Sequence, residues 1–193
     1  MDTTLRSSRA AFLFVAVAAS GGLTLVASQK PVNQDAQTMS AFTARAHTYV
    51  LLHRKIEGAI KKPGDSATPQ ELDTYQRELG RAIIAARPNA RAGDIFGPDM
   101  TALVKRLLAP VFSGSDGAHL KHAISDEEPH PVPPVVNARY PDDVPLSTMP
   151  PDVLKALPRL EEEIEYRFIG RHLILLDPHA HLVVDVVQNA MPA

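Results

Sequence analysis

Eight prolines lie between Pro129 and Pro151, and they constrain the fold more than any other feature of the sequence. Proline fixes its φ angle and has no backbone N–H. A stretch with this many prolines therefore forms neither a continuous helix nor a central strand. It prefers an extended, polyproline-like path. We therefore expect a stiff strap at residues 128–160 that separates two regions of different secondary structure.

The strap also carries apolar side chains that a free linker would not need. For this reason we expect it to pack against the rest of the domain, with a short helix from Asp152 to Leu157. An alternative interpretation is a docking segment for a partner protein. The apolar positions are Val135, Val136, Tyr140, Val144, Leu146 and Met149.

Residues 38–127, before the strap, predict an antiparallel helical body. Apolar residues recur at steps of three and four from Met39 to Ile60, as on one face of a helix. Thr68-Pro69-Gln70-Glu71 has the order of a capping box that starts a second helix, which ends before Pro88. A third helix follows Pro98, and Pro110 should kink or stop it. Residues 113–117 are expected to form a loop before a short fourth helix capped by Asp116.

Residues 161–190, after the strap, change to the period of strands. Ile164, Tyr166 and Phe168 alternate with charged residues, and Gly170 suits a tight hairpin turn. Two further short apolar runs complete a three-stranded antiparallel meander, so the expected fold class is α+β. So small a sheet must lie on the helices or pair with another copy along an open edge.

Residues 1–28 have the order of a secretory signal. Arg6 and Arg9 precede an uncharged, apolar run, which small residues follow. The expected location is therefore the periplasm or the exterior of a bacterium. An uncleaved inner-membrane anchor is the alternative, and it would be the only membrane contact.

The composition excludes several function classes. A formal net charge of −2 provides no broad basic field for nucleic acid. The absence of Cys removes disulfides, thiol catalysis and cysteine–zinc sites. Neither Gly-x-Ser-x-Gly nor His-Glu-x-x-His occurs, so no catalytic residue and no organic cofactor site is assigned.

Two groups of histidines are candidate metal ligands. His119 and His122 stand three apart on a predicted helix, with Asp126 one turn further on. The other group combines His172, Asp177, His179 and His181, which a tight hairpin could bring together. Imidazole with carboxylate suits zinc, nickel or copper.

The ordinary interpretation of both groups is a polar, solvated surface. His53 lies on the apolar face of the first helix, and we interpret it as a histidine at the edge of the core rather than as a ligand.

The last third of the chain resembles a group of uncharacterised exported bacterial proteins. The segments that carry the resemblance are Val136-Asn-Ala-Arg-Tyr-Pro-Asp-Asp-Val-Pro-Leu-Ser-Thr-Met-Pro-Pro151 and Glu165-Tyr-Arg-Phe-Ile-Gly-Arg-His-Leu-Ile-Leu-Leu-Asp177. The resemblance implies an exported protein and a shared fold, but it implies no particular activity. At the level of pattern, the closing meander is also similar to that of small periplasmic nickel/cobalt-homeostasis proteins, with no metal ligand matched.

Three function classes follow. The first is a non-enzymatic binding or envelope-associated protein, with a protein partner or self-association through the sheet edge. The second is a periplasmic metal-binding accessory protein that uses the histidines. The third is a hydrolase whose residues converge only in the fold, which requires a pocket with a histidine beside a serine or carboxylate.

Overall fold

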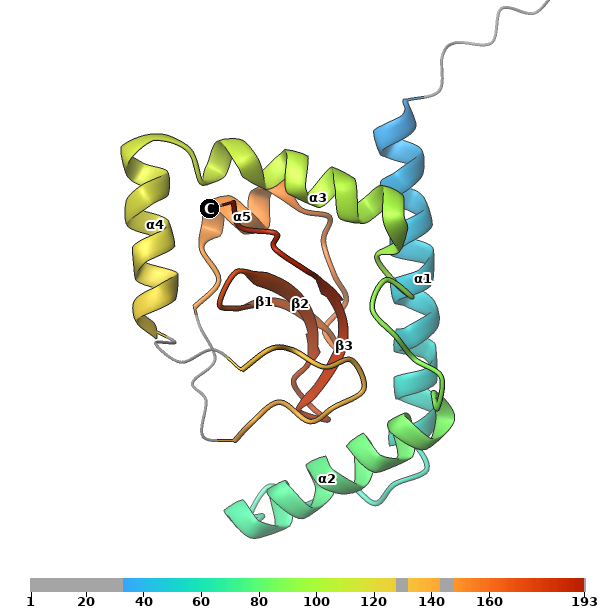
Figure 1. The fold of residues 1–193 in the computed structure, drawn as a ribbon. Coiled ribbons are helices and arrows are strands. Elements are labelled where there is room, and N and C mark those ends of the chain that lie inside the picture. The colour runs from blue at the N-terminus through green and yellow to red at the C-terminus, as the bar shows by residue number, and fades with distance from the viewer. Residues whose placement is uncertain (1–32, 128–131, 143–147, 193) are drawn as a thin grey trace, which may run out of the picture. The chain divides into compact units, whose positions relative to one another are not determined.

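The computed structural model describes residues 33–127, 132–142 and 148–192, which form an α+β body of helices around a small sheet (Figure 1). The signal expected in residues 1–28, and Val144 and Leu146 of the strap, lie outside the described residues. Among the helices that the structure describes, none is long and apolar enough to cross a bilayer.

The first two helices form where the local signals predict them. Helix α1 (Gln34–Glu57) begins after Asn33, whose side chain accepts from the backbone N–H of Asp35. Helix α2 (Pro69–Ala86) has the predicted capping box, in which the Thr68 side chain and the Glu71 carboxylate each accept from the other's backbone N–H. Both devices satisfy N–H groups that a helix start leaves unpaired.

Helices α3 (Gly97–Val111) and α4 (Gly114–Glu127) differ from expectation at their junction. Pro110 stands inside the last turn of α3, which ends one residue later. The prediction of a loop at residues 113–117 is wrong, because α4 already begins at Gly114 and Asp116 lies in its first turn. Gly117 permits this sharp junction, since a Cβ there would overlap the backbone of Phe112.

The C-terminal meander consists of β1 (Glu165–Ile169), β2 (His172–Asp177) and β3 (Leu182–Val187), in the order β1-β2-β3. All pairs are antiparallel, and Gly170 turns the first hairpin with a φ of 53°. A register shift between Leu175 and Leu176 interrupts the second pair. The expectation of a three-stranded meander is confirmed.

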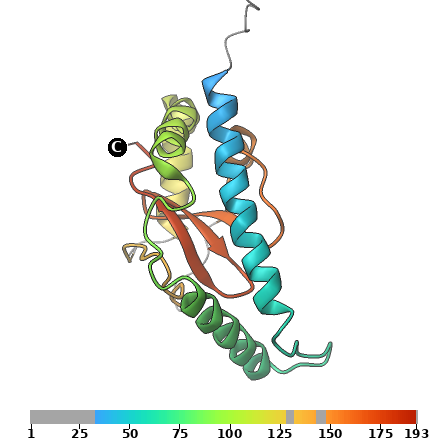
Figure 2. The ribbon, with the colours of Figure 1, turned by 90° about the vertical axis from the view of Figure 1, so that its right-hand side faces the viewer.

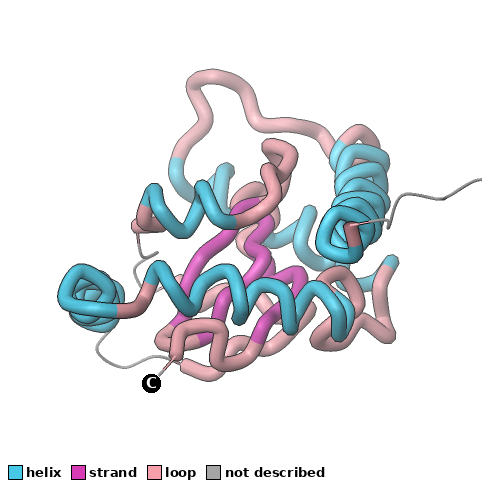
Figure 3. Tube along the Cα trace, turned by 90° about the horizontal axis from the view of Figure 1, so that it is seen from above, coloured by secondary structure: helices cyan, strands magenta, loops and turns pink. Residues whose placement is uncertain are grey.

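Helices and the strap bury opposite faces of this sheet. Leu173 and Leu175 of β2 belong to the main core, together with Phe42 of α1 and Phe96 before α3. Ile174, on the other face, belongs to a second cluster with Tyr140 of the strap. Seen from above, the helices surround the three strands (Figure 3). The alternation of a strand thus supplies two apolar surfaces, and each is covered.

The described part of the strap also pairs with the sheet. The N–H groups of Asn137 and Tyr140 donate to the carbonyls of Val183 and His181, and the N–H of Val183 donates to the carbonyl of Ala138. A short helix, α5 (Pro151–Ala156), follows. Tyr140 and Met149 are buried, whereas Val135 is exposed.

Asp185 of β3 is a buried carboxylate that holds the connection between α2 and α3. One oxygen accepts from the N–H groups of Ile95 and Phe96 at 2.7 and 2.8 Å, and the other accepts from that of Gly93 at 2.6 Å. Its own strand contributes the N–H of Val186 at 2.7 Å. Four amide donors compensate the buried charge and fix this connection onto the sheet.

We predict that Asp185→Ala lowers the free energy of unfolding by about 3 kcal/mol or more, because it leaves several buried N–H groups without an acceptor. Chemical denaturation followed by circular dichroism measures the loss. Asp65→Ala, at an exposed loop position, is the control and should change stability by less than about 0.5 kcal/mol. A similarly small loss for Asp185→Ala would show that the connection does not depend on this carboxylate.

Candidate functional site

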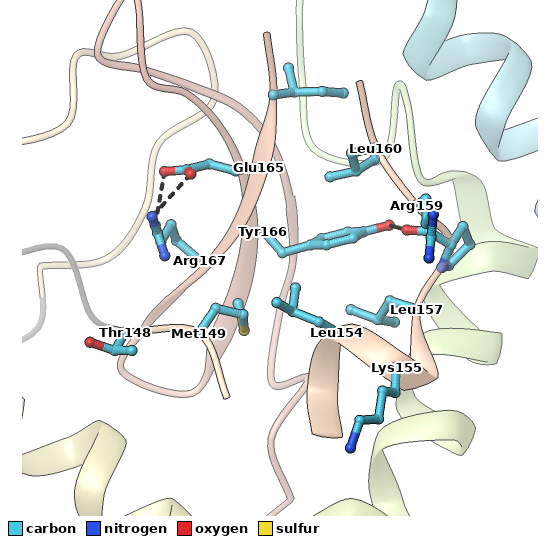
Figure 4. Close-up of a pocket in the computed structure, with 12 residues that line it drawn as sticks. Thr148, Met149, Leu154, Lys155, Leu157, Arg159, Leu160, Glu165, Tyr166 and Arg167 are labelled. Carbon is cyan, nitrogen blue, oxygen red and sulfur yellow. Dashed lines mark hydrogen bonds and ion pairs between the residues drawn. The ribbon is translucent and has the colours of Figure 1, made fainter. Parts of the chain in front are cut away.

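A hollow of about 850 Å³ lies between α5 and β1 (Figure 4). The Tyr166 ring extends across it, and its hydroxyl donates to the carbonyl of Pro158 at 3.1 Å. On the other side, Arg167 donates to Glu165. No histidine is among the described residues that line it. We therefore place the candidate site where histidines and carboxylates meet.

That place is centred on the carboxylate of Asp177, at the end of β2. One of its oxygens accepts from the hydroxyl of Tyr49 and lies against Nδ1 of His53, each at 2.6 Å. The other oxygen accepts from the N–H of Ala180 at 2.8 Å. Asp177 and His53 have no exposed surface. Because a carboxylate only accepts, the proton of a neutral His53 lies on Nδ1, and Nε2 carries a lone pair.

The other ring nitrogen of His53 faces a second carboxylate and a second imidazole. His53 Nε2 is buried and has no hydrogen-bond partner among the described residues. It lies 3.9 Å from Glu57, one turn further along α1, and Glu57 lies 3.6 Å from Nδ1 of His179. One ligand atom from each of the three residues lies within 4.8 Å of the others. In the described part of the chain, this is the only such group of three or more.

Glu57 is held in its ionised form. Burial works to raise the pKa of Glu57, but hydrogen bonds from Lys62 and Tyr75 and the charges of Lys62 and His53 outweigh it and lower the pKa. Lys62 Nζ lies 3.0 Å from one oxygen, and the Tyr75 hydroxyl donates to the other at 2.9 Å. Burial and this bond raise the pKa of Tyr75 to about 12, so it remains a donor.

His53 holds its proton more firmly than an ordinary histidine. Burial works to lower the pKa of His53, but the hydrogen bond and charge of Asp177, with the charges of Glu57 and Glu163, more than offset it and raise the pKa above 6.5. Burial, with the neighbouring Asp177 carboxylate, also raises the pKa of Tyr49 well above its usual value. Of the two side chains that donate to Asp177, only the histidine has a second nitrogen that can bind a ligand.

The site opens into a hollow of about 360 Å³ between α1, α2 and the turn after β2. Tyr75, Lys62 and Glu57 line it together with His179, which is 47% exposed. His53 is therefore the buried part of the site, whereas His179 and Lys62 are exposed at the hollow.

The structure brings together only part of the predicted group of His172, Asp177, His179 and His181. Asp177 and His179 belong to the site, but His172 accepts from the N–H of Asn189, and His181 stacks on the Tyr140 ring at 5.6 Å. The segment after Asp177 is a turn, in which His181 takes a φ of 52°, and this turn separates His179 from His181. His179 consequently faces α1, and His181 faces the strap.

The second predicted group is also divided. His122 Nδ1 lies 2.7 Å from Asp126 on the exposed surface of α4. His119 is exposed and does not join them in a shared group. His53 lies on the buried face of α1, and its partner there is the ionisable side chain of Asp177. Glu57 was missed, although its position four residues after His53 places both on one helix face.

Comparisons with known proteins gave no match among family models, curated proteins or solved structures. The geometry of the site is therefore the basis for the functional conclusion.

We predict that, without metal, stability falls as the pH rises above about 6.5. A folded-state pKa of His53 above the unfolded value of 6.5 means that the stabilisation is fully present below about 6.5 and is lost as the pH passes the folded pKa. His172 and His181, whose pKa values burial lowers with help from nearby arginines, affect stability below about 6.5 instead.

Urea denaturation between about pH 6.5 and 9 measures this slope, and NMR titration of the His53 ring reports the pKa directly. His53→Gln should flatten the slope. A His53 ring that titrates below its ordinary value would contradict the assigned partnership with Asp177.

Proposed function

We propose that this protein binds a divalent transition-metal ion, with His53 Nε2, the Glu57 carboxylate and the His179 imidazole as its ligands. The observation that carries the proposal is the buried, unpartnered Nε2 of His53, which faces an ionised carboxylate and a second imidazole. A buried polar atom without a partner is costly, and a metal ion would satisfy it.

The ligand set indicates the class of metal. Two imidazoles and one carboxylate suit zinc, nickel or copper better than calcium or magnesium, which prefer oxygen ligands alone. Asp177 has the position of the carboxylate that commonly orients a metal-bound histidine through its other ring nitrogen. Binding requires Lys62 to leave Glu57, and this is easy because the Lys62 side chain is 62% exposed.

The number of ligands favours reversible binding over a structural role. Three protein ligands leave a coordination position on the side of the hollow beside Tyr75, whereas structural zinc sites are closed by four. The proposed function therefore belongs to the class of non-enzymatic binding proteins, with a metal ion as the ligand. The order of residues 1–28 and the pattern shared with nickel/cobalt-homeostasis proteins support a role outside the cytoplasm, as an accessory protein that takes up and releases metal.

We predict that the protein binds zinc, nickel or copper with micromolar or tighter affinity, measured by calorimetry after removal of metals on a chelating resin. His53→Ala, Glu57→Gln and His179→Ala should each weaken binding by more than about tenfold, and Asp177→Asn by about 10- to 100-fold. Affinity should rise with pH, because the metal displaces the proton of His53.

His181→Ala and His122→Ala are matched controls, because each removes an imidazole from a group that lies apart from the site. Both variants should bind the metal ion with the same affinity as the unaltered chain. The proposal is wrong if none of the three metals binds, or if His181→Ala weakens binding as much as His179→Ala does.

A further inference from the structure

Another hollow, of about 410 Å³, lies between α1 and the connection from α2 to α3. Figure 2 shows this connection beside α1, which faces the viewer. The lining contains two arginines, Arg45 from α1 and Arg87 from the end of α2. Tyr49, Leu52 and Ile95 provide apolar surface between them. Tyr49 thus contacts this hollow with its ring while its hydroxyl binds Asp177.

Neither arginine forms an ion pair with any residue that the structure describes. Arg45 donates to the carbonyls of Ile95 and Phe96, at 2.5 and 2.7 Å. The only carboxylate in the described lining, Asp94, instead accepts from the backbone N–H of Arg91 and lies 4.0 Å from its side chain. The lining therefore has two cationic groups and one carboxylate that is engaged elsewhere.

Arg87 is the less satisfied of the two. Its Nη1 is buried and has no hydrogen-bond partner among the described residues, and its Nη2 reaches the carbonyl of Val184 only at 3.5 Å. The guanidinium carbon lies 5.0 Å from the centre of the Tyr49 ring, a cation–π contact that compensates the charge in part. A guanidinium stays charged in proteins, so a partly buried one whose Nη1 has no partner favours an anionic group beside it.

A neighbouring group of arginines shows the contrast. Arg77 and Arg139 lie near each other between α2 and the strap, and both bind the carboxylates of Asp73 and Asp142. Protein carboxylates there neutralise the cations. Arg45 and Arg87 have no such partners in the described part of the chain. Their hollow, of about 410 Å³, is nevertheless larger than the hollow of about 240 Å³ that Arg77 and Arg139 line.

We propose that the hollow beside Arg45 and Arg87 binds a small organic anion. Its carboxylate or phosphate lies against the two guanidinium groups, and its apolar part lies against Leu52 and Ile95. Arginine presents paired N–H groups that match both kinds of oxyanion. A volume of about 410 Å³ leaves room beyond the charged group, in the range typical of small-molecule sites.

The test uses the 193-residue chain freed of metals on a chelating resin, so that its result is independent of the proposed metal site. Benzoate, succinate and inorganic phosphate are the probes, and neutral benzamide is the control for benzoate. Calorimetry and ¹H–¹⁵N NMR follow binding. We expect saturable binding of at least one anion, shifts at the Ile95 and Tyr49 amides, and no binding of benzamide.

Arg87→Met should weaken the binding of that anion at least tenfold, and Arg45→Gln should weaken it as well if Arg87→Met fails to fold. Arg106→Gln removes the same charge from an exposed side chain that pairs with Asp35 outside the hollow, and it should leave binding unchanged. The inference is overturned if no anion saturates by about 10 mM, a weak limit for a specific site, or if Arg106→Gln weakens binding as much as Arg87→Met does.

Discussion

The buried carboxylate of Asp177 is the contact on which the arrangement of this protein depends. It ends β2, and it accepts from Tyr49 of α1 and from the turn that leads into β3 while it binds His53. A charge taken out of water is destabilising unless several donors surround it, so sheet, turn and helix must be placed together. The same contact sets the orientation of His53 and directs its second nitrogen at Glu57.

Two buried aspartates join the sheet to the helical body in different ways. Asp185 is surrounded by backbone N–H groups, which have no further atom to offer once they have donated. Asp177 accepts from one backbone N–H and from two side chains, and the imidazole among these retains a nitrogen without a partner among the described residues. Asp185 therefore holds the connection between α2 and α3 on the sheet. Asp177 also orients His53, whose second nitrogen faces Glu57.

The sequence predicted what short-range chemistry decides and missed what long-range contacts decide. The capping box at Thr68 and the turn at Gly170 depend on neighbouring residues, so both could be recognised. His53 and Asp177 are 124 residues apart, and their contact becomes visible only when β2 packs on α1. His179 was a candidate ligand, but its partners were sought in its own hairpin. The pairing of His53 with Glu57 on one helix face was the signal available for a better prediction.

The central claim is that His53, Glu57 and His179 together ligate one metal ion. X-ray absorption spectroscopy of the zinc-loaded chain tests it most directly, by reporting the number and kind of coordinating atoms. We expect two imidazole nitrogens at about 2.0 Å with oxygen donors beside them, and one imidazole fewer in His179→Ala. A zinc shell of oxygen atoms alone, or one that His179→Ala leaves unchanged, would contradict the claim.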